Sequence, residues 1–273
     1  MIPLEDNLAD IIGKAQRGLG LSDTQLAEKA RVNSQTVRKL REGEFDELTV
    51  LRIAPVLGLA GRALCELAHG AWRPKPVDNI DGLAQFTTRY GDVAVNSYLV
   101  WDPATKHAAA FDTGADCTAM LKRATKENLA IKLILLTHAH VDHIAALGEL
   151  KEKTSAPAFI PEREKIPEAE PIDEGKHFSL GKIDIDTRLT WGHSHGGMTY
   201  VVNGLARKVA MVGDSIFAGS MGGGSVSYRD AVRNNLEKIL TLPDDTIICP
   251  GHGPMTTVGE EKQHNPFFAG QTA

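Results

Sequence analysis

Apolar residues recur at helical spacing, in short blocks, over residues 7–69. The blocks are separated by the segments RGLGLSD, RVNS and REGEFDE, which contain helix breakers and residues that favour helix N-caps. This pattern predicts about five short helices. The helical spacing stops in the segment WRPKPVDNIDG, where two prolines lie among several turn formers. We therefore predict a helical domain at residues 1–72 and a linker at residues 73–80.

Beyond the linker the pattern changes to one of strands that alternate with helices. Apolar runs such as VAVNSYLVW, IKLILLT, KVAMVGD and DTIICP are followed or preceded by amphipathic segments such as DCTAMLKRATKENL and YRDAVRNNLEKILTL. This alternation predicts an α/β domain over residues 81–273. The glycine-rich segment GSMGGGSVS at residues 219–227 predicts a loop near a ligand.

Composition narrows the class of protein. The chain is 42% hydrophobic and 24% charged with a formal net charge of −5, which is typical of a globular protein in water. No run approaches the roughly 20 apolar residues of a membrane span. The acidic N-terminus lacks the pattern of a secretory signal, so we expect a cytoplasmic protein without a membrane partner. The three distant cysteines fit neither a disulfide framework nor a metal knuckle, and we interpret them as reduced thiols.

The strongest chemical signal is the segment LILLTHAHVDH. Residues 131–136 read as a buried strand, and His138 and His140 lie two residues apart, so extended backbone would project them to the same side. Asp142 and His143 follow at the start of a predicted helix and point elsewhere. Histidines often lie in cores without binding anything, but this spacing rarely arises by chance. Imidazole and carboxylate are ligands of Zn²⁺, and two pairs with different directions suit two adjacent metals.

Three further candidate ligands each follow a strand-like segment. His193 comes after KIDIDTRLTWG, Asp214 after KVAMVG and His252 after TIICPG. A glycine precedes each of them and would let the backbone turn sharply at the strand end. Together with the first motif, four strand ends would bring ligands to one edge of a sheet, where open α/β folds bind their ligands.

These segments resemble the metallo-β-lactamase superfamily, particularly its glyoxalase II-like hydrolases, over residues 80–270. The resemblance is carried by VNSYLV, AAFDTGAD, THAHVDH, LTWGHSHGG, GDSIFAGS and PDDTIICPGHGPMTTVGEEKQHNPF. It implies an αββα sandwich with the metals at one end of two sheets. It also implies that Asp112 is a buried structural aspartate, and that the ligand in LTWGHSHGG is His193, not His195.

The resemblance further implies a ligand set and a reaction. Two divalent metal ions are expected, with zinc favoured over iron or manganese, and Asp214 bridges them. A shared water would ionise and attack the acyl carbonyl of a thioester or related small ester. Asp142 is the candidate to pass a proton to the leaving group. The first metal takes His138, His140 and His193, and the second takes Asp142, His143 and His252.

Two positions depart from the family pattern and are candidate substrate contacts. His195 stands where the family has proline, and we favour a role in supporting the ligands over contact with substrate. Phe217 stands three residues after Asp214, where the lactone hydrolases of the superfamily have tyrosine, which argues against a lactonase.

The segment LSDTQLAEKARVNSQTVRKLREGE resembles the helix-turn-helix of phage repressors. In that family the second helix enters the DNA major groove, so the implied DNA contacts are Ser34, Gln35, Arg38 and Lys39. Arg31 departs from the family pattern, which has glycine there because that turn favours positive φ, so we expect the turn to be strained or altered. Residues 1–75 carry eleven lysines and arginines against ten acidic residues, so DNA affinity would rest on a local basic group, doubled in a homodimer. The alternative is a helical dimerisation or substrate-capping module.

Three functions remain open from the sequence. The first is a metal-dependent hydrolase, and the second is a DNA-binding regulator whose metal domain senses a metabolite. The third is a mononuclear iron persulfide dioxygenase, which shares much of the ligand set.

Overall fold

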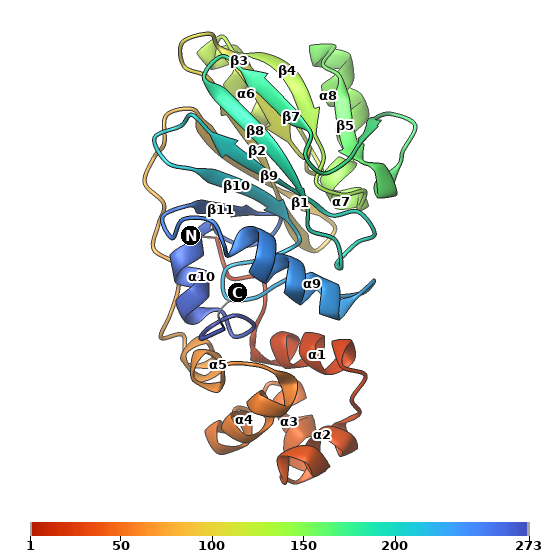
Figure 1. Ribbon diagram of the computed structural model, residues 1–273, viewed down its shortest axis with the longest axis vertical. Coiled ribbons are helices and arrows are strands. Elements are labelled where there is room, and N and C mark those ends of the chain that lie inside the picture. Colours follow the sequence, from red (N-terminus) through yellow and green to blue (C-terminus); the bar gives the residue numbers. More distant parts are fainter. Residues whose placement is uncertain (1, 272–273) are drawn as a thin grey trace.

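The protein consists of a helical region and a two-sheet region that lie end to end (Figure 1). The computed structural model describes residues 2–271. Within that range no helix combines the length and apolar character that crossing a bilayer requires.

The helical region contains the five short helices that the sequence predicts. Polar N-caps fix their starts: the side chains of Asn7, Ser22, Asn33 and Asp46 accept hydrogen bonds from backbone N–H groups of the first turn. The helices are α1 (Leu8–Gly18), α2 (Asp23–Ala30), α3 (Ser34–Arg41), α4 (Glu47–Ile53) and α5 (Gly61–Ala68), with a 3₁₀ turn, η1 (Ala54–Leu57), between the last two.

The connection between α2 and α3 places Arg31 in an uncommon backbone conformation. Arg31 ends α2 with φ 55° and ψ 47°, in the left-handed region. A glycine would adopt this conformation without steric cost, whereas an arginine adopts it less readily. The chain therefore turns between α2 and α3 through a conformation that is strained for arginine.

The rest of the chain forms two six-stranded mixed sheets. The first has the order β1-β2-β3-β4-β5-β6 and the second β12-β11-β10-β9-β8-β7. The first comprises β1 (Leu83–Tyr90), β2 (Val93–Trp101), β3 (His107–Phe111), β4 (Ala130–Leu135), β5 (Ala158–Pro161) and β6 (Glu170–Ile172). The second comprises β7 (His177–Leu180), β8 (Ile183–Leu189), β9 (Met198–Asn203), β10 (Val209–Gly213), β11 (Ile247–Pro250) and β12 (Thr256–Thr257).

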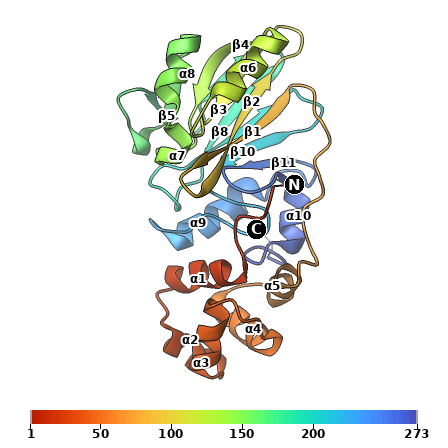
Figure 2. The same ribbon diagram turned by 180° about the vertical axis from the view of Figure 1, so that it is seen from behind.

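Helices cover the outer faces of both sheets (Figure 2). Helices α6 (Thr118–Glu127) and α8 (Leu147–Thr154) lie on the first sheet. Helix α9 (Tyr228–Asn234), which continues into a π-helical turn (Asn235–Ile239), and α10 (Val258–His264) lie on the second. The short elements α7 (Val141–Ile144) and η2 (Glu162–Glu164) follow β4 and β5. The predicted sandwich of two sheets between helical layers is therefore confirmed.

Three hydrophobic clusters hold these layers together. One fills the space between the sheets, with Phe111 and Tyr200 among its largest side chains, and a second lies under α6 and α8. The third joins the outer face of the second sheet to the helical region, so that Ile12 belongs to the same cluster as Val212 and Phe268. Residues 73–80 contain no helix or strand. The domain boundaries at 72 and 80 stay predictions, because this core continues across them.

Candidate metal centre

The seven candidate ligands lie at one end of the two sheets, each placed by the end of a strand. His138 and His140 follow β4, and Asp142 and His143 lie in α7 directly after them. His193 follows β8, Asp214 follows β10 and His252 follows β11. The sequence predicted this delivery from four strand ends, and the structure brings all seven side chains together.

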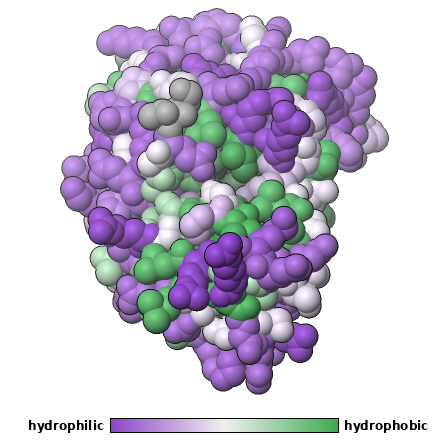
Figure 3. All heavy atoms as spheres, turned by 60° about the horizontal axis from the view of Figure 1, so that its bottom comes forward, coloured by the Kyte–Doolittle hydropathy of each residue, from purple (hydrophilic) through white to green (hydrophobic). Residues whose placement is uncertain are grey.

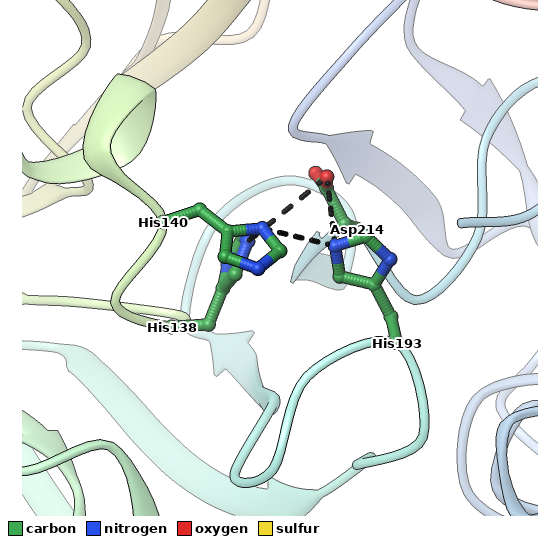
Figure 4. Close-up of side chains that lie close together, drawn as sticks. All are labelled: His138, His140, His193 and Asp214. Carbon is green, nitrogen blue, oxygen red and sulfur yellow. Dashed lines mark hydrogen bonds and ion pairs between the residues drawn. The ribbon is translucent and has the colours of Figure 1, made fainter. Parts of the chain in front are cut away.

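One group consists of His138, His140, His193 and Asp214, whose possible ligand atoms lie within 4.8 Å of one another (Figure 4). The Nδ1 atom of His140 is 2.9 Å from Nε2 of His138 and 3.1 Å from Nε2 of His193. The Oδ2 atom of Asp214 is 3.3 Å from Nε2 of His193. Three imidazoles and one carboxylate oxygen thus surround a common point.

A second group consists of Asp142, His143 and His252. Nε2 of His252 is 3.4 Å from Oδ2 of Asp142, and Nε2 of His143 is 3.8 Å from the same oxygen. Asp214 reaches this group too, since its Oδ2 is 3.3 Å from His252 Nε2 and its Oδ1 is 3.2 Å from His143 Nε2. The carboxylate of Asp214 therefore lies between the two groups, in the position that a bridging ligand requires.

The outward nitrogen of four histidines has a partner that fixes the ring. Nδ1 of His138 lies 3.0 Å from the Thr137 hydroxyl, and Nδ1 of His143 lies 2.8 Å from Oδ2 of Asp112. Backbone carbonyls do the same elsewhere: Gly223 O is 2.9 Å from Nδ1 of His193, and Ala94 O is 2.7 Å from Nδ1 of His252. Such partners fix the tautomer of a metal-ligating histidine and raise its basicity. These four rings present Nε2 to the centre, whereas His140 presents Nδ1.

Two atoms at the centre lack the partner that burial demands. Among the described residues, His143 Nε2 and Asp214 Oδ1 are buried and make no hydrogen bond, although they lie 3.2 Å apart. Leaving both atoms unsatisfied in the interior would cost a few kcal/mol each. A cation that both atoms contact removes this cost, so the donor set fits divalent metals such as zinc.

The charge states also fit a metal site. Burial and the neighbouring His143 hold the pKa of His138 well below its usual range, so this ring is neutral, as a ligand must be. Burial alone would raise the pKa of Asp214, but His252 and His143 lower it well below the usual value. Burial lowers the pKa of His252, yet Asp214 raises it to about 9. A cation would take the place of that proton, since metal binding and protonation compete for the same nitrogen.

The glycines that precede the ligands act in two different ways. Gly213 has φ 50°, so it supplies the sharp turn that the sequence predicted. At Gly251 the requirement is space: a Cβ atom there would lie 2.3 Å from Oδ1 of Asp214 and 2.5 Å from Cε1 of His143. Any larger residue at position 251 would displace the centre.

Asp112 and Glu164 support the ligand loops from outside. The buried Asp112 accepts hydrogen bonds from the backbone N–H and the hydroxyl of Thr137, in addition to its contact with His143. Glu164 accepts hydrogen bonds from Ala139 N at 3.3 Å and Gly196 N at 2.7 Å, and so connects two ligand loops. Sequence reasoning missed Glu164, because it stands in an ordinary charged segment, EREKIPE, with no distinguishing motif.

The two candidate substrate contacts differ in their surroundings. The side chain of His195 is exposed and lies outside both ligand groups. Phe217 is buried, and its ring meets that of His252 edge-on with centroids 5.6 Å apart. Of the two, Phe217 is in contact with a candidate ligand.

The candidate DNA contacts lie on α3, in the helical region at one end of the molecule (Figure 1), and outside both ligand groups. Gln35, Arg38 and Lys39 are exposed, and Ser34 is half-buried. Lys39 Nζ is paired with Glu44 at 2.9 Å, which neutralises part of the positive charge on this face. No geometry at this end distinguishes a DNA-binding surface from an ordinary solvated helix among the described residues.

Comparison with known proteins identifies the family. A family model described as the metallo-beta-lactamase superfamily matches residues 90–252. The chain belongs to this superfamily. Hydroxyacylglutathione hydrolase GloC of Haemophilus influenzae is 30% identical over 198 residues, which cover 63% of this chain and 92% of that protein. The probable metallo-hydrolase YqgX of Bacillus subtilis is 31% identical over 225 residues, which cover 73% of this chain and 98% of that protein.

A solved structure of the superfamily gives a similar picture. The protein TTHA1623, crystallised in a di-iron-bound form, superposes with a TM-score of 0.55 at 27% identity, and the superposition covers 67% of this chain and 100% of that one. The helical region lies before the segment that the family model matches. Superfamily membership therefore accounts for the sheets and the metal centre and leaves the helical region to be explained.

Proposed function

We propose that the protein is a metal-dependent hydrolase of thioesters or related small esters, with two divalent metal ions. The observation that carries the proposal is the position of Asp214, whose carboxylate lies within 3.3 Å of histidine nitrogens in both ligand groups. The hydrolase names of the two relatives support the same reaction class. Zinc suits the donor set best, and iron is the alternative that the di-iron neighbour favours.

The exposure of the candidate ligands indicates from which side a substrate reaches the centre and which side chain can transfer a proton. Two cations, when bound, supply an ionised water and polarise the acyl carbonyl. His140 is exposed and Asp142 is half-buried, whereas His138, His143 and His252 are buried. The substrate therefore approaches on the side of His140 and Asp142. On that side the carboxylate of Asp142 is the group that can hold a proton for the departing thiol or alcohol.

The test measures metal content and turnover on the same sample. Protein purified without added metal is analysed for zinc, iron and manganese, and a panel of thioesters that includes S-D-lactoylglutathione is then assayed. We expect two metals per chain, and we expect His138→Ala to lower turnover by roughly 10³-fold. One iron per chain with oxygen-dependent persulfide oxidation would instead support the dioxygenase. Full metal content without turnover of any ester would contradict the hydrolase.

A second candidate function is DNA binding by the helical region, in a protein whose metal domain senses a metabolite. The observation that favours it is the three-residue connection between α2 and α3, with Arg31 in the left-handed conformation at its start. Exposed Gln35 and Arg38 would then contact bases or phosphates, as a homodimer on two half-sites.

Footprinting on genomic fragments, with and without small acyl compounds, tests this second function. We expect Arg38→Ala to weaken binding by roughly 10-fold, which corresponds to about 1.4 kcal/mol, without changing metal content. Equal, weak affinity for all fragments would leave the helical region as a dimerisation or capping module.

A further inference from the structure

A single loop after β10 contacts both ligand groups. We call residues 217–223 the site loop. At its start the ring of Phe217 meets His252. At its end the carbonyl oxygen of Gly223 fixes Nδ1 of His193 at 2.9 Å. The loop passes so close to the centre that a Cβ atom on Gly222 would lie 2.9 Å from Nδ1 of His193. The position of this loop therefore sets the orientation of two candidate ligands.

The helical region holds the site loop through one buried ion pair. Lys14 of α1 is paired with Asp6, which precedes the helix, and their side chains are only 14% and 8% exposed. Lys14 Nζ donates a hydrogen bond to the carbonyl oxygen of Met221 at 2.9 Å. The hydroxyl of Ser220 donates to Asp6 Oδ2. Each member of the ion pair thus forms a hydrogen bond with the site loop.

The same ammonium group also faces the start of the loop. Lys14 Nζ lies 5.1 Å from the centroid of the Phe217 ring, within the range of a cation–π interaction. One side chain of α1 therefore contacts the loop on both sides of Ser220. Apolar contacts add to this attachment, since Gly219 packs so closely on Trp72 and Leu67 that a Cβ atom there would lie 2.8 Å from the Trp72 ring.

Apolar contacts and the ion pair make different contributions. Apolar packing is non-directional and would hold the loop near α1 without fixing which backbone atom faces the helix. A buried pair gains little net stability, because desolvation opposes its attraction, but its hydrogen bonds are directional and favour one arrangement. Here those bonds go to two successive residues of the site loop, so they fix its register relative to α1.

We propose that Asp6 and Lys14 are positioning residues of the metal centre, which act by fixing the site loop and through it His193 and His252. The helical region then helps to position the metal ligands, whether or not α3 binds DNA. The inference rests on the proposed function in one respect, that the centre holds metal, and it does not depend on which ester is hydrolysed.

The experiment compares metal affinity with stability in full-length variants. Lys14→Met removes the ammonium group and keeps most of the side-chain length. Lys14→Arg keeps the charge. Arg17→Met is the matched control, because Arg17 is an exposed cation on the same helix. Zinc affinity is measured by competition with a chromophoric chelator, and thermal unfolding is followed on the metal-free proteins.

We expect Lys14→Met to lower zinc affinity by roughly 10-fold, as the loss of an outer partner of a metal ligand does elsewhere. Lys14→Arg should recover most of the loss, and Arg17→Met should bind zinc as the wild type does. For any ester that is turned over, kcat should fall with KM nearly unchanged, because the change alters the ligands and leaves the substrate's entry side intact.

A folded Lys14→Met protein with wild-type zinc affinity overturns the inference. If Lys14→Met does not fold, the double variant Asp6→Asn with Lys14→Met carries the test, since it leaves no unpaired buried charge. Wild-type zinc affinity in the double variant would again overturn the inference. Failure of the wild type itself to bind zinc would count against the proposed function instead, so the two failures are distinguishable.

Discussion

The metal centre and helix α3 differ in how far their ionisable side chains are buried. At the sheet end His138, His143 and Asp214 are at least nine-tenths buried, with nitrogen and oxygen atoms facing one another. At the helical end Arg38 and Lys39 point into solvent. Burying imidazole and carboxylate is costly unless something pairs with them, whereas exposing a lysine costs nothing. The sheet end therefore argues for a ligand by itself, and the helical end does not.

Figure 3 shows the surface of the molecule with the helical region turned toward the viewer. Hydrophobic side chains lie exposed between strongly hydrophilic ones on this face. The exposed hydrophobics of the helical region include Leu48 at 72% and Leu51 at 44%. Such a surface is compatible with a second copy of the chain or with solvent alone. The predictions that follow test how far the two ends differ, beginning with the centre itself.

The largest effect is expected at Asp214, the carboxylate that both ligand groups share. Asp214→Asn keeps the shape of the side chain and removes its charge, so both groups lose the one anion that they share. We expect metal content to fall below two per chain and ester turnover to drop by about 10³-fold or more. Elemental analysis and turnover on one sample measure both. Retention of two tightly bound metals would show that the bridging role is wrong.

A smaller effect is expected at Asp112, which touches the centre through His143. Asp112→Asn removes the charge beside Nδ1 of that ring and one acceptor for Thr137. We expect zinc affinity to fall by roughly 10- to 100-fold, and binding of DNA, if present, to stay unchanged. Zinc competition and footprinting measure the two. Equal losses of zinc affinity and of DNA binding would mean that the substitution destabilises the whole fold.

These outer partners also mark where prediction from sequence stops. The strands before His193, Asp214 and His252 could be predicted, because a buried strand followed by glycine and a polar residue leaves a distinctive pattern. Helices α1, α2, α3 and α4 could be predicted from their N-caps. The carbonyls of Ala94 and Gly223 could not, because every residue carries a carbonyl and only the fold selects which one faces a histidine.

The contacts of the helical region were hidden for a related reason. Asp6 and Lys14 look like ordinary charges on an amphipathic helix and its cap segment, yet the fold buries them against a loop more than 200 residues away in the chain. Arg31 was predictable, because its conformation depends on the local turn alone. Local features could thus be read from the sequence, and contacts between distant segments required the structure.

We expect the stability of the fold to depend on pH through a buried carboxyl group where α10 contacts the site loop. Glu261 of α10 is fully buried, and it accepts hydrogen bonds from Gly219 of the site loop, Thr256 and Asn265. Burial raises its pKa from 4.5 to about 7, although these donors lower it. Between these values the folded chain binds more protons here than the unfolded chain does. The stability that Glu261 contributes is therefore present at acidic pH and lost as pH rises through about 7.

Urea unfolding at about pH 5 and about pH 8 measures this loss, for which we expect roughly 2 kcal/mol. Glu261→Gln should remove most of the difference, whereas Glu237→Gln, at an exposed position, should leave it unchanged. If Glu261→Gln kept the full pH dependence, other groups would be responsible, with the candidate ligand histidines first among them.

The smallest effect is expected at Arg31, in the turn between α2 and α3. Glycine adopts φ 55° without the clash that a Cβ atom meets, so Arg31→Gly should raise the free energy of unfolding by about 0.5–1 kcal/mol. Arg31→Ala is the control, because it removes the charge and keeps the Cβ atom, and it should bring no such gain. Chemical unfolding of the full chain measures both variants. Since Arg31 lies far from the sheets, zinc affinity should be unchanged in each, and a change there would show that the helical end and the metal centre are coupled through their shared core.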